Sequence, residues 1–482
     1  MATVTSGIAQ ANGVQYLAGQ DYYDKVQTNF FLDNMPDALN TSTVLLDKIE
    51  KTTRQTVSGR YIMWPVLKGQ SLGVANVGYG SVIPDPGYRG ADMAGTISRK
   101  MMMRIALDGD TIRHGKTNGG AYMEAQRIEM EGVMNAAMLN RARQVHNDGS
   151  GRIGTLKALT ASAAVDCVFT MQVNTSIEGA ATTRGAGTLE NYIENNMCVA
   201  FCTSAATMRL GSTVNTNQTG FFVRDIAISG NDVTFKLSLT PGGAAILANT
   251  VQNIAANDWI VVAGVVDASN LSCGVKHEIL GIGGIFSDTG VIDGMQGSAT
   301  QQSMTAFDVT TTSSTYFQGI LCSSNLYNQG IVLDNSGIGN RPLTEALLQQ
   351  AVSDAERINN ANVEFLLSHP YTYDSYVALL VRDKRYQNTT DLGGGHTSLS
   401  FNGLKWVKDR FCYQNRVYGL ALSGQIEICE TSPLAPLNAG DVTTWERVTN
   451  QDKYSRGWVR DDQLIVSDIR NRCGFVLTEL VA

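Results

Sequence analysis

The segment 109–117 comes closest to catalytic chemistry, because it approaches the pattern of a phosphate-binding loop. Its sequence is GDTIRHGKT. A P-loop follows G-x-x-x-x-G-K-[ST], so that backbone amides surround the phosphate and the lysine reaches it. Here five residues separate Gly109 from Gly115, and Asn-Gly-Gly follows Thr117 before the next helical stretch. The amides of that helix therefore do not point at the loop. An enzyme that hydrolyses nucleotides is kept only as an alternative.

Histidine and cysteine, the usual metal ligands, are too scattered here to form a site. No two of the five histidines lie three or four residues apart. Cys198 and Cys202 are the close pair among eight cysteines, and no histidine is near them. The run GGGH at 393–396 indicates a loop, since no helix signal follows. We therefore expect no metal, no cofactor and no catalytic residue, and we expect the cysteines to be buried free thiols.

Arg99, Lys100 and Arg104 concentrate positive charge in the apolar stretch ISRKMMMRIAL at 97–107. The whole chain is acidic, with a net charge of −7, which argues against a strongly basic nucleic-acid binder and against a polybasic membrane binder. We favour docking of these three side chains on an acidic surface of a neighbouring subunit. Binding of phosphate and a solvated basic face are the alternatives.

Length and composition indicate a globular chain of two to four domains. It has 482 residues, of which 43% are hydrophobic and 17% are charged. No apolar run reaches the roughly 18–20 residues that a membrane span needs. The N-terminal sequence has neither the basic start nor the long apolar core of a signal peptide.

Residues 59–106 read as a long β-hairpin with a Gly/Pro-rich tip at 84–90 and a second strand at 97–107. A two-stranded ribbon of this length is only marginally stable in water. We therefore expect another subunit to cover it, with Trp64 and Lys68 among the residues in contact.

Apolar residues with a helical period predict the longest helix at 120–146, with Met123, Met130, Met134 and Met138 along one face. A methionine stripe can form a promiscuous binding groove, but we interpret this one as core. Further helices are expected at 41–54, 342–361 and 373–386.

The part from 165 to about 275 is rich in strand patterns. It includes a hairpin at 221–240 and a buried strand after Asp258. The stretch 363–370 predicts another buried strand, and the C-terminal part alternates strands. The expected fold class is therefore α+β.

The order of these elements resembles the major capsid proteins of tailed bacteriophages, of the Hong Kong 97 type. The stretch 369–422 carries the closest similarity, with HPYTYDSYVALLVRDKRYQN followed by FNGLKWVKDRFCYQNRVYGLAL. The resemblance implies a fold with an N-terminal arm, an E-loop, a long spine helix in a P-domain, an A-domain and an enlarged β-rich insertion. Its implied parts are an arm at 1–58, an E-loop ribbon at 59–106, the spine helix and start of the P-domain at 107–164, the insertion at 165–280, the A-domain with connecting segments at 281–455 and the return strands of the P-domain at 456–482.

The same resemblance implies a structural protein that is not an enzyme. Its copies would assemble as hexamers and pentamers into an icosahedral shell around double-stranded DNA. The implied partners are further copies of the chain, a separate scaffolding protein, a portal, a decoration protein and DNA bound without sequence specificity, and no membrane. Its place would be the virion capsid, after synthesis in the cytoplasm of a bacterial host. The alternative is another phage structural protein, a component of the tail or baseplate.

Overall fold

The fold is taken from a computed structural model. It describes residues 43–52, 56–59, 61–68, 73–82, 87, 90–109, 119–147, 149, 151–160, 168–172, 192–202, 221–229, 232–239, 242–246, 254–262, 278–286, 316–317, 320–321, 331–333, 341–359, 362–382, 390–391, 397–423, 425–437, 446–447, 452–467 and 474–481. Of the predicted N-terminal arm at 1–58, residues 1–42 lie outside the described part of the chain.

The chain forms two compact units, each assembled from separate stretches of sequence. Within the described residues, the first unit takes 43–47, Arg99–Ala142 and Glu430–Asp462. The second unit takes Lys48–Ser98, Arg143–Cys429 and the residues from Gln463 onward. Both units mix helices with strands, which agrees with the expected α+β class.

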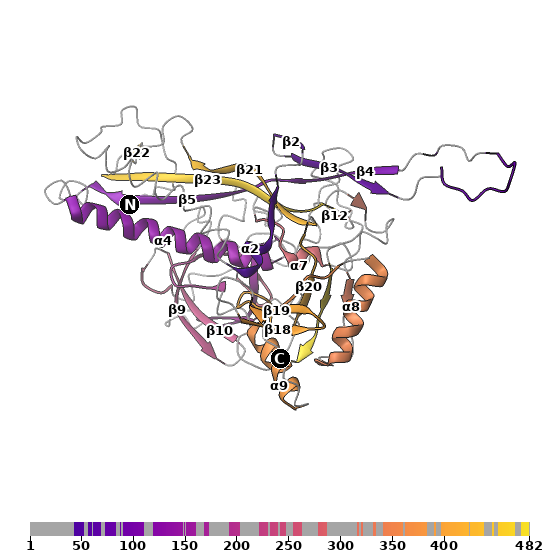
Figure 1. The fold of residues 1–482 in the computed structure, drawn as a ribbon. Helices are drawn as coiled ribbons and strands as arrows, with labels where there is room; N and C mark the ends of the chain where they lie inside the picture. The colour runs from indigo at the N-terminus through magenta and orange to yellow at the C-terminus, as the bar shows by residue number, and fades with distance from the viewer. Residues whose placement is uncertain are drawn as a thin grey trace. The chain divides into compact units, whose positions relative to one another are not determined.

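The first unit is organised around the long helix α4 (Gly119–His146), whose last residues belong to the second unit. Figure 1 shows α4 running alongside β5 (Arg99–Asp108) and β23 (Lys453–Val466), which are antiparallel neighbours. Apolar side chains of the helix and the strands form one core. Its buried members are Met103, Ile105, Leu107, Met130, Ala137, Leu434 and Trp458.

This core confirms the prediction of a long helix at 120–146 and the interpretation of its methionines as core. Met130 is buried, and Met134 and Met138 pack against the same cluster while partly exposed. Arg127 and Glu131, at the border of the packed face of the helix, form an exposed ion pair at 3.1 Å. The side chain of Met123 is not among the described ones.

The strand β23 is the centre of a five-stranded sheet. Its order is β1 (Glu50–Thr52), β21 (Ile426–Pro436), β23 and β22 (Glu446–Arg447), and β5 also pairs with β23. The pair of β1 with β21 is parallel, and that of β22 with β23 is antiparallel.

A three-stranded antiparallel ribbon contains β2 (Thr56–Ser58), β3 (Tyr61–Lys68) and β4 (Gly90–Ile97). The register of β3 and β4 runs from Tyr61 opposite Ile97 to Lys68 opposite Gly90. The expected strand at 97–107 is confirmed as β5, but its expected pairing as the second strand of the hairpin is wrong, because β4 pairs with β3 and β5 pairs with β23. The physical reason is that Met103, Ile105 and Leu107 alternate toward the core under α4, which fixes the partner of β5.

Six strands close into a barrel within the second unit. They are β6 (Arg152–Thr160), β7 (Val168–Gln172), β8 (Cys198–Cys202), β9 (Phe221–Ser229), β10 (Asp232–Ser238) and β11 (Trp259–Val262), in the spatial order β10-β7-β6-β11-β8-β9. Phe169 fills the interior with Phe201 and Phe235, at ring distances of 5.5 and 5.7 Å. The hairpin at 221–240 and the strand after Asp258 are confirmed, although the barrel already begins at Arg152.

The cysteines are not all free thiols, so this expectation is wrong at Cys202, which is disulfide-bonded. Cys412 and Cys429 are buried thiols. Burial also raises the pKa of the Cys198 thiol to about 11, which keeps it protonated and unreactive at neutral pH.

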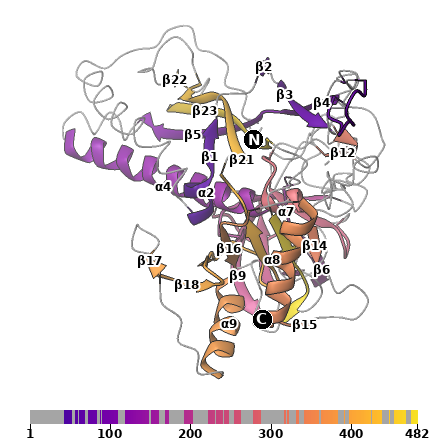
Figure 2. The ribbon, with the colours of Figure 1, turned by 45° about the vertical axis from the view of Figure 1, so that its right-hand side comes forward.

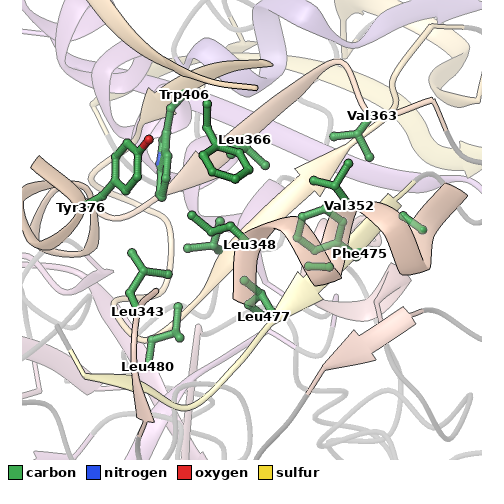
Figure 3. Close-up of a cluster of buried hydrophobic side chains, with 14 of the residues drawn as sticks. Leu343, Leu348, Val352, Val363, Leu366, Tyr376, Trp406, Phe475, Leu477 and Leu480 are labelled. Atoms are coloured by element: carbon green, nitrogen blue, oxygen red, sulfur yellow. The ribbon is translucent and has the colours of Figure 1, made fainter. Parts of the chain in front are cut away.

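A seven-stranded sheet forms the other large part of the second unit. Its order is β14 (Ile331–Leu333), β24 (Gly474–Leu477), β20 (Val417–Leu420), β16 (Phe365–Ser368), β19 (Leu404–Lys408), β18 (Thr397–Phe401) and β17 (Thr390–Asp391). Helix α8 (Glu345–Asn359) packs against β14 and β24, as Figures 1 and 2 show. Figure 3 shows its Leu348 and Val352 in one cluster with Phe475 and Leu477. Tyr376 of α9 (Pro370–Arg382) stacks on Trp406 of β19 at 4.3 Å.

The remaining predicted helices exist with shifted ends. Helix α8 begins after Thr344, whose Oγ1 accepts a hydrogen bond from the Leu347 amide at 3.2 Å. Pro342 instead lies in β15 (Arg341–Pro342), which is parallel to β25 (Leu480–Val481). The helix expected at 41–54 is shorter: α2 (Val44–Lys48) ends where β1 joins the sheet.

Two short elements complete the described structure, α7 (Ile282–Ile285) and the hairpin of β12 (Tyr316–Phe317) with β13 (Ile320–Leu321). Among the described residues, we find no helix that combines the length and the apolar character of a membrane span.

Candidate assembly interface

The ribbon of β3 and β4 has one face that is buried within its own chain. Ile62, Trp64 and Val66 alternate along β3 and are each at most 5% exposed. Trp64 lies opposite Ala94, which is also buried, and its indole N–H has no hydrogen-bond partner among the described residues. The other face is open, since Met93 is 56% exposed. The ribbon therefore has a packed side and an exposed apolar side.

Beyond the ends of β3 and β4, the segment 73–82 (GVANVGYGSV) extends from the ribbon without strand pairing, as Figure 1 shows. We call this segment the ribbon tip. It has no charged residue. Val74, Tyr79 and Val82 are 85, 113 and 88% exposed, and Val77 is 53% exposed. Of the eight large hydrophobic side chains exposed in the described structure, five belong to the ribbon and its tip.

The sequence did not single out these four apolar side chains of the tip. The pattern of 59–84 predicts an alternating strand, broken by four glycines, that leads to a tip at 84–90, whereas β3 ends at Lys68. A signal was present in VANVGYGSV, where valines and a tyrosine are separated by small residues and no charge occurs. An exposed stretch of this kind, with apolar side chains and no charge, is typical of a surface that another protein surface covers.

Arg99, Lys100 and Arg104 do not lie on the ribbon but on β5, beyond Ser98. The side chains of Lys100 and Arg104 are on the exposed face of this strand, which they share with Met102. Arg104 donates a hydrogen bond to Ser455 Oγ at 3.0 Å. Arg99 is opposite Asp462 in the register with β23, and Lys100 is opposite Asp461. Acidic residues therefore face this basic cluster within the same chain.

Asp462 belongs to a buried ionic network of the first unit. It accepts two hydrogen bonds from Arg141 at 3.1 and 2.6 Å, and one of its oxygens lies 2.8 Å from Arg460 Nε. Arg460 also pairs with Glu430. Burial lowers the pKa of Arg141, although the charge of Asp462 opposes this. The network connects α4 to β21 and β23 inside the first unit, where removal of one partner would leave a buried charge unpaired.

A second set of polar contacts, within the second unit, fixes the C-terminal end of α4. Arg143 forms a bidentate pair with Glu278, whose charge outweighs burial and raises the pKa of Arg143. His146 Nε2 lies 3.2 Å from Asp409 Oδ2, and both residues are buried. The Tyr413 hydroxyl donates to Asn147 Oδ1 at 3.1 Å. A Cβ on Gly281 would overlap the carbonyl oxygens of the last turn, so glycine is required for this close approach.

His369 is a buried histidine at the start of a helix. It is 4% exposed and directly precedes α9, where its Nδ1 accepts a hydrogen bond from the Tyr371 amide at 3.3 Å. Burial lowers the pKa of His369 to about 4, although the charge of Asp409 opposes this. A helix N-terminus also disfavours a cation, so the neutral ring acts here as a helix cap.

The described part of the chain holds no candidate metal site, and most of the loop at 109–117 lies outside it. No group of three or more His, Cys, Asp or Glu among those residues could hold a metal ion. Of the loop at 109–117, the structure describes Gly109, and a Cβ there would overlap the Asp452 carboxylate. A carboxylate at that point would repel a phosphate. The run at 393–396 lies outside the described residues.

No protein-family model and no curated protein sequence matches the chain. Solved structures do match. The cyanophage A-1(L) capsid asymmetric unit has 11% identity and a TM-score of 0.45, over 100% of this chain and 98% of that chain. The satellite phage P4 procapsid has 8% identity and a TM-score of 0.37, over 93% and 90% of the two chains. The capsid of Myoviridae phage XM1 has 7% identity and a TM-score of 0.37, over 91% and 92%.

These identities and TM-scores are too low to support a conclusion about function. The three solved structures to which the chain is similar are all phage capsids or procapsids.

Proposed function

We propose that the chain is a major capsid protein of a tailed bacteriophage, whose copies assemble as hexamers and pentamers into an icosahedral shell around double-stranded DNA. The exposed apolar surface of the ribbon and its tip is the observation that carries this proposal. Monomeric soluble proteins rarely leave such groups of apolar side chains in water. A shell in which each ribbon lies on the next subunit removes them from water in every copy.

The arrangement of the first unit supports the same proposal. A helix of 28 residues lies against two long strands, in a layer held by apolar packing and by the buried ion pairs of Arg141 and Arg460. A stiff layer of this kind suits a wall that must keep its shape.

Five residues remain proposed contacts between subunits: Arg99, Lys100, Arg104, Trp64 and Lys68. Lys100 and Arg104 are the best placed, because their side chains are exposed on β5. Trp64 is already covered within its own chain, so it would support the ribbon rather than form the contact itself. The nearby Asp461 and Asp462 reduce the attraction that the basic cluster offers to a neighbour.

The proposed partners are further copies, a separate scaffolding protein, a portal and a decoration protein. DNA would be enclosed without sequence-specific contacts, which suits a net charge of −7. The proposed location is the virion capsid, after synthesis in the bacterial cytoplasm, and no enzymatic activity is proposed. The alternative is a tail or baseplate component, for which the closed six-stranded barrel is the supporting feature.

Negative-stain micrographs of the purified protein, alone and with its presumed scaffolding protein, test the proposal. Closed round shells of uniform size are expected. Tubes or small trimers would favour the tail or baseplate alternative, and particles that stay monomeric under both conditions would overturn the capsid function.

A further inference from the structure

The ribbon tip ends in a β-turn that presents one aromatic side chain. The Ser81 amide donates a hydrogen bond to the Gly78 carbonyl oxygen at 3.1 Å, which closes a turn of four residues, Gly78–Ser81. Gly80 has φ +79°, whereas Tyr79 is not among the residues of positive φ. This combination is that of a type II turn, with Tyr79 at its second position and glycine where a positive φ is required.

Tyr79 is fully exposed at the apex of this turn, and a Cβ on Gly80 would have no atom within 4 Å. Val74, Val77 and Val82 surround the turn in sequence and are exposed as well. The conformation of the turn is thus fixed by its own hydrogen bond and by Gly80. The apolar side chains of the tip are therefore buried only to a small extent by the subunit that carries them.

We propose that Tyr79 is the anchor by which the ribbon tip binds a second copy of the chain, inserted into an apolar surface of that copy. This inference rests on the proposed function. Tyrosines are frequent hot spots of interfaces, because a rigid ring buries a large area at a low cost in entropy. A turn that holds the ring in place before binding lowers this cost further.

The chemistry of the tip favours another copy over other partners. The segment 73–82 has no cation to attract nucleic acid and no anion to attract a basic protein. The described structure also has exposed apolar side chains away from the ribbon, namely Met102 on β5, Ile128 on α4 and Ile228 in the barrel. Contact of the tip of one copy with a different surface of the next is heterologous, and such contacts form a closed ring when the rotation between copies closes.

The variants Tyr79→Ala, Tyr79→Phe and Gly80→Ala test the anchor, with Tyr79→Phe as the matched control that keeps the aromatic ring at the same position. Tyr79→Ala is expected to raise the subunit concentration needed for shells at least tenfold, as the loss of a hot spot does. Tyr79→Phe keeps the ring and is expected to stay within about threefold, since hydrogen bonding of the hydroxyl is not required. Gly80→Ala keeps the ring but strains the turn, so its effect is expected between these two.

The thermal midpoint of the isolated subunit is expected to stay unchanged in all three variants. If Tyr79→Ala assembles at the same concentration as the unchanged chain, Tyr79 is not the anchor. If the unchanged chain forms no shells at all, the proposed function fails first, and the two failures are thereby distinguished.

Photo-crosslinking identifies the partner. Replacement of Tyr79 by p-benzoylphenylalanine and irradiation of assembled particles is expected to give an adduct of twice the mass of the chain. An adduct within one chain, or an adduct to another protein, would overturn the assignment of a second copy as the partner.

Discussion

At the scale of single residues, His369 connects the fold to acid stability. Its pKa is lowered from 6.5 to about 4 in the folded chain, so between these values the unfolded chain binds a proton that the folded chain does not. The free energy of unfolding must then fall as the pH falls through this window and stay level above it. The shift corresponds to a loss of about 3 kcal/mol between neutral pH and pH ~4.

The variant His369→Asn tests this linkage, because its amide oxygen can replace Nδ1 as acceptor for the Tyr371 amide. We expect the free energy of unfolding of the variant to change less between pH ~7 and pH ~4.5 than that of the parent. Denaturant unfolding at both pH values measures it. The low pKa of Asp409, favoured by His146, affects stability only below its ordinary value near 3.8 and does not overlap with this window. Equal pH dependence of variant and parent would refute the role of His369.

At the scale of elements, the packing of α4 on β5 and β23 offers a matched pair of substitutions. Met130 is 3% exposed in the core of the first unit, whereas Ile128, two residues earlier on the same helix, is 57% exposed. We expect Met130→Ala to lower the free energy of unfolding by about 2–5 kcal/mol. Ile128→Ala should stay within about 0.5 kcal/mol. Similar losses in the two variants would contradict the assigned face of the helix.

The ribbon tip is expected to matter for assembly but not for folding. Replacement of 70–88 by a short turn keeps the paired residues of β3 and β4 and removes the exposed apolar side chains. The thermal midpoint should match that of the parent, while sedimentation should show subunits or small oligomers instead of shells. Normal shells from the shortened chain would show that the ribbon tip is not part of the interface.

The barrel is expected to fold as a unit of its own, because its ends meet. The Val262 amide donates to the Gly151 carbonyl at 3.3 Å, and Gly149 packs against Ile279 and Leu280. The isolated segment 148–278 should therefore show strand-type circular dichroism and one cooperative thermal transition. A spectrum without cooperative melting would mean that the barrel depends on the rest of the second unit.

Periodic elements could be predicted from the sequence, whereas pairing partners and surfaces could not. The spacing of apolar residues predicts the helix at 120–146 and the buried strand at 363–370, and both are present. The pairing partner of 97–107 was predicted wrongly, because alternation of apolar and polar residues shows which side chains share a face of a strand but not which strand lies beside it. The neighbour of β5 is β23, some 350 residues later in the chain. The tip was missed because apolar residues between glycines read equally as strand or as uncovered loop.

At the scale of the whole molecule, we propose that the chain is a shell subunit whose ribbons are covered by neighbouring copies. Its composition fits such a role, since 17% charged residues leave much of the surface able to pack against other copies. The free chain is then an incomplete structure. In the proposed shell, the apolar side chains of the ribbon that are exposed in one copy would become buried, and assembly would stabilise the chain by mass action.

Electron cryo-microscopy of particles assembled from the full chain measures the symmetry of the assembly and the burial of the ribbon tip most directly. The account predicts closed shells with icosahedral symmetry, with subunits arranged in hexamers and pentamers and with density for 73–82 enclosed between neighbouring copies. Particles of helical or threefold symmetry, or a shell in which 73–82 remains exposed to solvent, would contradict it.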